Sequence, residues 1–275
     1  MASPTPLRAH VIAGGFPPGA HAGHDHDYAR LRLLEFLREK EVPASVSNDF
    51  DDVEKWLTRS KLLITYVAGP YPNEAQDRAI RQWLEDGGCW LGLHGTSGGR
   101  AVRYSETDRR RKMLKLSHHE TLGGFFLNHP PVRRFQVRVS DAGDTLTDGL
   151  PQSFEVIDEP YMIEVQDPAT TRVLLTAELG PDTSPPGFGF AYDEDTALMP
   201  DGKTRVLGYT RDIGKGGVTY IAIGHCHNTS TNVQPFVDTS VDPEGKTPPT
   251  LRQTWETSAF QSLIRNSIDW GMRTG

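Results

Sequence analysis

Short apolar runs and amphipathic stretches alternate along the first hundred residues. The run Leu62–Val67 is nearly continuous and ends at turn residues, which is typical of a strand covered on both faces. In the segment Tyr28–Lys40, leucines recur along one stripe, as in an amphipathic helix. The alternation predicts an α/β protein with a doubly wound, parallel sheet. The expected strands are 8–13, 43–47, 62–67 and 89–93, and the expected helices are 28–40, 51–57 and 73–86.

The pattern changes after residue 100. Residues 105–121 are expected to form one more helix, and additional β-strands then dominate the second half. Two polar loops, 181–202 and 229–249, interrupt these strands. Because neither internal repeats nor a long linker divide the chain, we expect a single domain over residues 1–275. The later strands are expected at 132–140, 154–157, 161–165, 172–177, 204–210 and 218–223, and a closing helix at 255–272.

Composition and charge narrow the classes of partner. The 275 residues are 36% hydrophobic and 24% charged, and the net charge is −7. A negative protein is poorly suited to non-specific binding of nucleic acid or of an anionic membrane. The apolar runs are far shorter than a membrane helix, and Met1–Pro6 lacks a signal-peptide pattern. With only two cysteines, Cys89 and Cys226, we expect a cytoplasmic protein without disulfides.

Two surface features have simple interpretations. A basic cluster falls on the helix expected at 105–121, where its charges would spread around the circumference, so we interpret it as a solvated face rather than an anion site. The surface around the segment Trp255–Trp270 is a candidate interface between two copies of this chain, and a homo-oligomer is therefore a further hypothesis. The basic cluster consists of Arg100, Arg103, Arg109, Arg110, Arg111, Lys112 and Lys115.

Histidines follow the ends of several predicted strands. His94 follows the apolar run 89–93, His225 and His227 follow the run 218–223, and His24 and His26 follow the first strand. In an open parallel sheet, ligands bind outside the carboxyl ends of the strands, so these imidazoles can converge on one crevice. Neutral imidazole is a common metal ligand and an acid–base group near pH 7. In the simpler alternative, the loop histidines are solvated and His94 only positions its turn.

Carboxylates and hydroxyls supply the other candidates. In the pair Asp158 and Glu159, one member would be a ligand or general base and the other a structural partner, although an acidic turn explains the pair equally well. Thr96 and Ser97 follow His94 and are candidate donors to a ligand, as is Tyr161. His129 precedes a proline and is expected to fix its loop.

Other kinds of chemistry have weaker support. The sequence lacks Gly-x-Ser-x-Gly, and its early glycines do not form a dinucleotide-binding motif that opens onto a helix, so no nucleotide cofactor is expected. Cys89 begins the strand that ends at His94, about 16 Å from that end at about 3.3 Å per residue. Cys226 is expected to be a buried small hydrophobe.

Together these segments resemble the ThuA-like (trehalose utilisation) family, which is related in fold to the class I glutamine amidotransferases. The similarity extends over nearly the whole chain, and its strength lies in the order of the motifs. The matching segments are Gly14–Gly15, Gly87–His94, Leu122–Pro130, Asp158–Tyr161, Gly214–Gly217, Ile223–His225 and the final helix from Phe260 to Trp270. The loops 181–202 and 229–249 depart from the family pattern.

The resemblance implies a flavodoxin-like sheet and a role in carbohydrate utilisation, with a keto-sugar or glycoside as substrate. His94 occupies the turn where amidotransferases carry their nucleophilic cysteine, so glutaminase activity is not expected. The leading hypothesis is an enzyme of hydrolase or isomerase type that has a Zn-like divalent metal. The alternative is a non-catalytic sugar-binding or regulatory protein. The expected residues are His94, Glu159 and His225 for catalysis, Thr96, Ser97, Tyr161 and His227 for substrate, and His24, His26, His94 and His225 for metal.

Overall fold

A nine-stranded mixed sheet forms the centre of the protein. The computed structural model describes residues 7–15, 20–108 and 110–273, so Met1–Pro6 and Arg109 lie outside the described residues. Five neighbouring strands are parallel, in the order β2-β1-β3-β4-β13. Their bounds are Ala9–Gly15 (β1), Ala44–Ser47 (β2), Leu62–Ala68 (β3), Cys89–Leu93 (β4) and Gly216–Ile221 (β13).

The second half of the sheet is antiparallel. It continues from β13 in the order β12-β11-β8-β9, and every pair in this half runs antiparallel. These strands are Thr204–Ile213 (β12), Arg172–Glu178 (β11), Arg133–Val139 (β8) and Ser153–Asp158 (β9). The prediction of an α/β protein with a parallel sheet and additional strands in the second half is therefore confirmed. A separate two-stranded sheet pairs Gly124–Asn128 (β7) with Met162–Val165 (β10).

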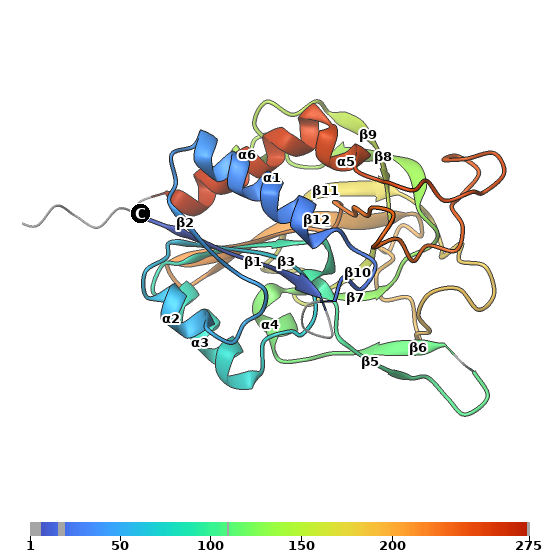
Figure 1. Ribbon diagram of the computed structural model, residues 1–275, viewed down its shortest axis with the longest axis horizontal. Coiled ribbons are helices and arrows are strands. Elements are labelled where there is room, and N and C mark those ends of the chain that lie inside the picture. Colours follow the sequence, from blue (N-terminus) through green and yellow to red (C-terminus); the bar gives the residue numbers. More distant parts are fainter. Residues whose placement is uncertain (1–6, 16–19, 109, 274–275) are drawn as a thin grey trace, which may run out of the picture.

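Helices cover both faces of the parallel half (Figure 1). His26–Glu39 (α1) and Ser258–Met272 (α6) lie on one face, while Val53–Leu57 (α2), Glu74–Glu85 (α3) and His118–Leu122 (α4) lie on the other. A short helix, Gln253–Glu256 (α5), precedes α6. Of these, α3 begins as predicted, because the Asn73 side chain accepts hydrogen bonds from two backbone amides and Gln76 completes a capping box.

The core lies between these layers and includes the tryptophans of the last helical segment. Trp255 is fully buried and donates a hydrogen bond from Nε1 to the Gly224 carbonyl at 2.7 Å, and Trp270 is 6% exposed. These two residues therefore stabilise the chain's own core, and an interface between copies around this segment stays a prediction. Among the described residues, no helix is long and apolar enough to cross a membrane.

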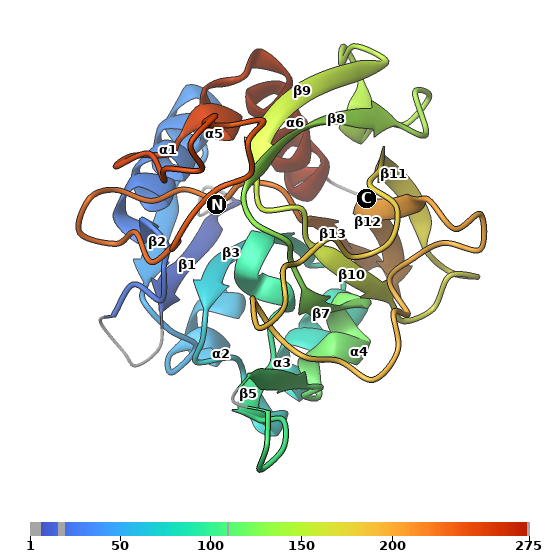
Figure 2. The same ribbon diagram turned by 90° about the vertical axis from the view of Figure 1, so that its right-hand side faces the viewer.

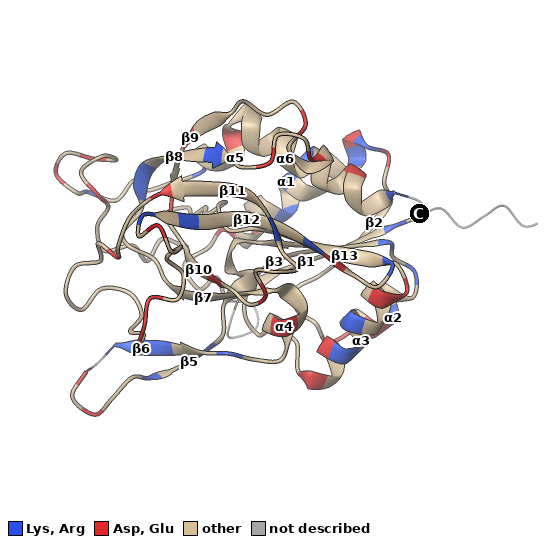
Figure 3. Ribbon diagram, turned by 180° about the vertical axis from the view of Figure 1, so that it is seen from behind, with Lys and Arg blue, Asp and Glu red and all other residues tan. Residues whose placement is uncertain are grey.

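The helix predicted over residues 105–121 is wrong. Arg100–Arg103 (β5) and Arg111–Leu114 (β6) instead form an antiparallel hairpin that projects from the body, and only α4 is helical (Figures 1 and 2). The segment between β5 and β6 is too polar to present an apolar helical face. Within the hairpin, Ala101 of β5 pairs with Met113 of β6. Four of the basic residues thus lie on the strands of a two-stranded ribbon (Figure 3): Arg100, Arg103, Arg111 and Lys112. Arg110 and Lys115 lie next to these strands. Three residues of the basic cluster have acidic partners: Arg110 pairs with Asp108, Lys112 with Asp193 and Lys115 with Glu164.

Candidate metal centre

The turn after β4 holds His94 in an unusual backbone conformation. His94 begins a short 3-10 helix, His94–Ser97 (η1). Its backbone φ is 45°, a left-handed value that residues other than glycine rarely adopt. The turn is fixed from two sides, because the Tyr220 hydroxyl donates to the His94 carbonyl at 2.8 Å and the backbone of Gly95 approaches β3 closely. A Cβ at Gly95 would lie 2.4 Å from the Val67 carbonyl oxygen. Such backbone strain is typical of functional sites.

Four buried side chains meet beside this turn. Each offers one donor atom, and these atoms all lie within 4.8 Å of one another: His24, His94, Glu159 and His225. His24 lies just before α1, His94 follows β4, Glu159 follows β9, and His225 follows β13. Because β1, β4 and β13 are parallel, their carboxyl ends meet at the same edge of the sheet. The structure thus brings His94 and His225 together, with ring centroids 5.6 Å apart.

Hydrogen bonds determine which nitrogen of each imidazole faces the centre. His94 Nδ1 lies 2.7 Å from the Ala222 carbonyl oxygen, and His24 Nδ1 lies 2.9 Å from the Ala22 carbonyl oxygen. A carbonyl only accepts, so both Nδ1 atoms must carry their protons. In the neutral rings, each Nε2 is therefore an unprotonated lone pair. The Nε2 of His24 is buried without a hydrogen-bond partner.

The same reasoning extends to His225. His227 Nε2 donates to the Pro248 carbonyl at 2.9 Å, so the Nδ1 of neutral His227 is an acceptor and lies 2.9 Å from His225 Nε2. His225 Nε2 must then carry the proton. Its Nδ1 is buried without a hydrogen-bond partner and lies 3.3 Å from the Glu159 carboxylate.

The centre therefore gathers lone pairs that repel one another unless a positive charge lies between them. Glu159 Oε2 is 3.1 Å from His94 Nε2 and 3.3 Å from His225 Nδ1. Two ligands of a tetrahedral zinc ion with bonds of about 2.0–2.1 Å lie about 3.3 Å apart. Three neutral imidazoles and one carboxylate are also ligand types that Zn²⁺ prefers. These two separations and the chemistry of the four donors fit a divalent, zinc-like ion.

The proton affinities of these groups are shifted by burial and by one another. Burial, and the neighbouring His94 and His225, lower the pKa of His24 well below its usual range. Burial opposes the charge of Glu159, but His129 and His225 hold the pKa of this carboxyl well below its usual range. Burial lowers the pKa of His225, but the Glu159 carboxylate more than offsets this and raises it. Without a cation, a proton on His225 balances the carboxylate, so protons and metal ions compete for the same place.

A second group of side chains holds the four donors in position. Asp158 accepts hydrogen bonds from three backbone amides: those of Glu159 at 2.8 Å, Gly224 at 2.7 Å and His225 at 3.0 Å. It thus connects the two segments that carry Glu159 and His225. Gln234 donates from its Nε2 to Glu159 Oε1, and His129 Nε2 lies 3.6 Å from that same oxygen.

The remaining predicted site residues lie around the centre. The Thr96 hydroxyl donates a hydrogen bond to the Thr65 carbonyl, and the Ser97 hydroxyl is hydrogen-bonded to the Tyr220 hydroxyl, so both side chains stabilise the turn. Their contact with substrate stays a prediction. The Tyr161 ring stacks on His94, with centroids 4.0 Å apart. His26 begins α1 and is not among the four residues whose donor atoms meet; its ring lies 5.8 Å from that of His24.

The sequence alone gave little indication of several residues that contact the donors. Gln234 and Pro248 lie in a polar loop without a motif, and only the three-dimensional fold brings them to Glu159 and His227. His129 was expected only to fix its loop, and its Nδ1 does lie 2.8 Å from the Pro130 carbonyl oxygen. Its position before a proline and after an apolar strand was the one available signal.

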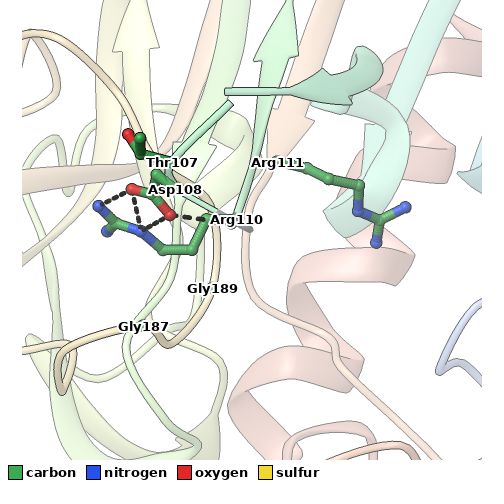
Figure 4. Close-up of a pocket in the computed structure, with 6 residues that line it drawn as sticks. All are labelled: Thr107, Asp108, Arg110, Arg111, Gly187 and Gly189. Carbon is green, nitrogen blue, oxygen red and sulfur yellow. Dashed lines mark hydrogen bonds and ion pairs between the residues drawn. The ribbon is translucent and has the colours of Figure 1, made fainter. Parts of the chain in front are cut away.

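One cavity of the structure is lined by none of the four donors. It has a volume of about 600 Å³ and is found between the turn of the β5–β6 hairpin and the glycines at 187 and 189. Figure 4 shows Arg110 bound to Asp108 on one side of this cavity and Arg111 on the other. The four donors line none of the three cavities described, and each donor is at most 9% exposed. The centre is thus enclosed.

The sheet order and the strained turn define a class of protein: a flavodoxin-like α/β protein with a histidine at the strained turn. The family model of ThuA, described as trehalose utilisation, matches residues 18–238. The chain belongs to the ThuA family. Among curated proteins, none matches the sequence.

Solved structures show the same fold at low identity. A ThuA-like protein from Bacteroides uniformis is 17% identical, with a TM-score of 0.62 over 98% of this chain and 94% of the other. One from Parabacteroides merdae is 14% identical, with a TM-score of 0.58 over 97% and 90%. A β-galactosidase from Rahnella sp. R3 is 14% identical, with a TM-score of 0.53 over 80% of this chain but only 29% of that chain. At these identities, the likenesses establish the fold alone.

Proposed function

We propose that this protein is a metal-dependent enzyme of carbohydrate utilisation that acts on a keto-sugar or glycoside at the His24, His94, Glu159 and His225 centre. The observation that carries the proposal is the convergence of four buried donor atoms within 4.8 Å, three of them imidazole nitrogens whose protons are directed away from the centre. Membership in a trehalose-utilisation family supports carbohydrate as the substrate class.

Residues around the centre would have separate roles in the reaction. When bound, a divalent ion supplies Lewis-acid polarisation of a substrate oxygen. Tyr161 stacks on His94 and excludes water from that face of the ring. His129 donates from Nδ1 to the Pro130 carbonyl, which leaves Nε2 free to accept a proton beside Glu159.

Thiol chemistry has no support at this site. The residue at the strained turn is His94, and Cys226 is fully buried beside Tyr66 and the Asp25 carbonyl. Burial raises the pKa of the Cys226 thiol to about 12, so it stays protonated at neutral pH. The proposed enzyme is therefore not a glutaminase.

The first test is metal analysis of protein purified without a histidine tag, followed by product analysis with keto-sugars and glycosides. We expect about one equivalent of a divalent metal, and we expect His94→Ala and Glu159→Gln to lose both the metal and turnover. His21→Ala removes an exposed imidazole that is not one of the four donors, and should keep both. Metal-free protein that cannot be loaded, together with unchanged turnover in His94→Ala, would contradict the proposal.

A non-catalytic sugar-binding protein is the second candidate. It is favoured by the enclosure of the centre, because four protein ligands with no open position are typical of structural zinc sites. This candidate predicts saturable sugar binding in a thermal-shift screen without product formation. Turnover that disappears in His94→Ala would exclude it.

A further inference from the structure

We propose that His227 is a positioning residue, which together with the Pro248 carbonyl fixes the tautomer of His225 so that Nδ1 is presented to the metal. The inference rests on the proposed metal centre. It gives His227 a role other than the substrate contact expected from the sequence.

The contacts of His227 leave it one arrangement of protons in the neutral ring. Its Nε2 lies 2.9 Å from the Pro248 carbonyl oxygen and its Nδ1 lies 2.9 Å from His225 Nε2. Since the carbonyl accepts only, His227 donates at Nε2 and accepts at Nδ1. The ring is 0% exposed, so water does not offer a competing partner.

The backbone of His227 is held independently of its ring. His227 and Leu251 exchange two backbone hydrogen bonds, of 3.1 and 3.0 Å, and the next residue, Asn228, donates to the Asp25 carboxylate at 2.8 Å. The main chain at this position therefore has anchors that a change of side chain leaves in place. For this reason, substitution of His227 can report on the ring rather than on the fold.

Loss of the acceptor at His227 would change what His225 offers to the centre. His225 Nδ1 already lies 3.3 Å from the Glu159 carboxylate. Without an acceptor at Nε2, the neutral ring is free to carry its proton on Nδ1 and donate it to that carboxylate. When a metal ion takes the place of the proton on Nδ1, the proton that remains on Nε2 would then be buried without an acceptor. Changes to partners of metal-binding histidines typically weaken metal affinity by about 10–100-fold.

Two near-isosteric variants separate the acceptor from the bulk of the ring. In His227→Asn, the side-chain oxygen can take the place of Nδ1 and accept from His225, so we expect the Zn²⁺ Kd to stay within about 3-fold of wild type. His227→Gln reaches toward Pro248 instead and leaves His225 without its acceptor. We expect its Kd to rise by about 10–100-fold. The probe is Zn²⁺ titrated against a competing chelator, with the Co²⁺ absorption spectrum as a second readout of ligand geometry.

His10→Gln is the matched control, because His10 is also fully buried but lies in β1, stacked on Trp56, and is not one of the four donors. It should bind Zn²⁺ as the wild type does. A wild type that binds Zn²⁺ while His227→Gln binds equally well would overturn this inference and leave the proposed function standing. Equal losses in His227→Asn and His227→Gln would also overturn it. A wild type that binds no divalent ion would overturn the proposed function itself, and this inference with it.

A second measurement needs no variant. In the Zn²⁺-loaded wild type, nitrogen NMR of the imidazoles should show His227 protonated at Nε2 and His225 protonated at Nε2. Protonation of His227 at Nδ1 would overturn the inference, whatever the folding of the variants.

Discussion

At the scale of single residues, the centre depends on groups that hold the donors as much as on the donors themselves. His94 adopts a φ of 45°, and its carbonyl accepts from Tyr220 while its ring is directed by Ala222. Asp158 has a comparable role for two other donors, because its carboxylate joins the backbone of Glu159 to that of Gly224 and His225. The adjacent acidic pair thus divides into one donor and one partner that supports the backbone.

This division predicts the effect of Asp158→Asn. The amide keeps one acceptor oxygen but turns an NH₂ group toward a backbone N–H, which leaves buried donors unpaired. We expect unfolding in urea to show a loss of about 1–3 kcal/mol and the Zn²⁺ affinity to fall with it.

Asp193→Asn is the matched control, since Asp193 is exposed and its ion pair with Lys112 spans 3.6 Å. That change should stay within about 0.5 kcal/mol of wild type. Equal stability of the two variants would show that the Asp158 carboxylate does not hold the segments together.

At the scale of elements, the sequence pattern predicts most of the fold. The strands β3 and β4 can be recognised as apolar runs because both of their faces are buried, and α3 can be recognised because its capping residues are close in sequence. The hairpin β5–β6 was not predicted, because its pairing depends on contacts between strands rather than on a periodic face. The imidazoles at the strand ends could be predicted to lie close together, because the carboxyl ends of parallel strands meet at one edge of the sheet. The groups that determine which nitrogen is protonated are backbone carbonyls, such as those of Ala222 and Pro248. Because every residue has a carbonyl, the sequence does not show which ones have this role.

The loop 229–249 is the element whose role only the structure indicates. It contributes Gln234, which donates to Glu159, and Phe236, whose ring lies 5.3 Å from Phe188 of the other polar loop. The two polar loops therefore meet next to the centre. Their contact makes this loop the candidate cover of the enclosed donors.

We expect Gln234→Ala to speed the release of metal. The change removes the donor that orients Glu159 and opens one contact of the covering loop, so release of Zn²⁺ to an excess of chelator should accelerate on the order of 10-fold. Val233→Ala is the control, because Val233 immediately precedes Gln234 in the chain and is 62% exposed. An unchanged release rate in Gln234→Ala would show that this contact neither covers nor orients the centre.

At the scale of the whole molecule, the parallel half carries three of the donors and the antiparallel half carries Glu159. The centre is therefore complete only when the parallel and antiparallel halves of the sheet have both folded and joined. The order of strands β2-β1-β3-β4-β13 places the donors at one edge, which is where flavodoxin-like sheets bind their ligands.

Buried histidines also set how the stability of the molecule depends on pH. Burial lowers the pKa of His10 to about 4, whereas an unfolded chain has a value of about 6.5. Between these values the unfolded state binds the proton and the folded state does not. The contribution to stability is therefore complete above pH 6.5 and is lost as the pH falls toward 4. For His10 this loss is about 3 kcal/mol.

The measurement compares urea unfolding of wild type with that of His10→Phe between pH 6.5 and pH 4.5. Phenylalanine keeps an aromatic ring against Trp56 but has no proton to bind. The variant should show a shallower loss of stability on acidification, and parallel curves would contradict the assignment to His10.

The β5–β6 hairpin lies between His94 and Glu159, which are 65 positions apart in the chain, and so divides the four donors into two pairs. A chain cut at the tip of this hairpin would yield an amino-terminal fragment with His24 and His94 and a carboxy-terminal fragment with Glu159 and His225. Neither fragment alone could form the proposed centre. Reassembly of the two pieces would then be strengthened by zinc according to its concentration and affinity, which would turn the protein into a metal-dependent split reporter.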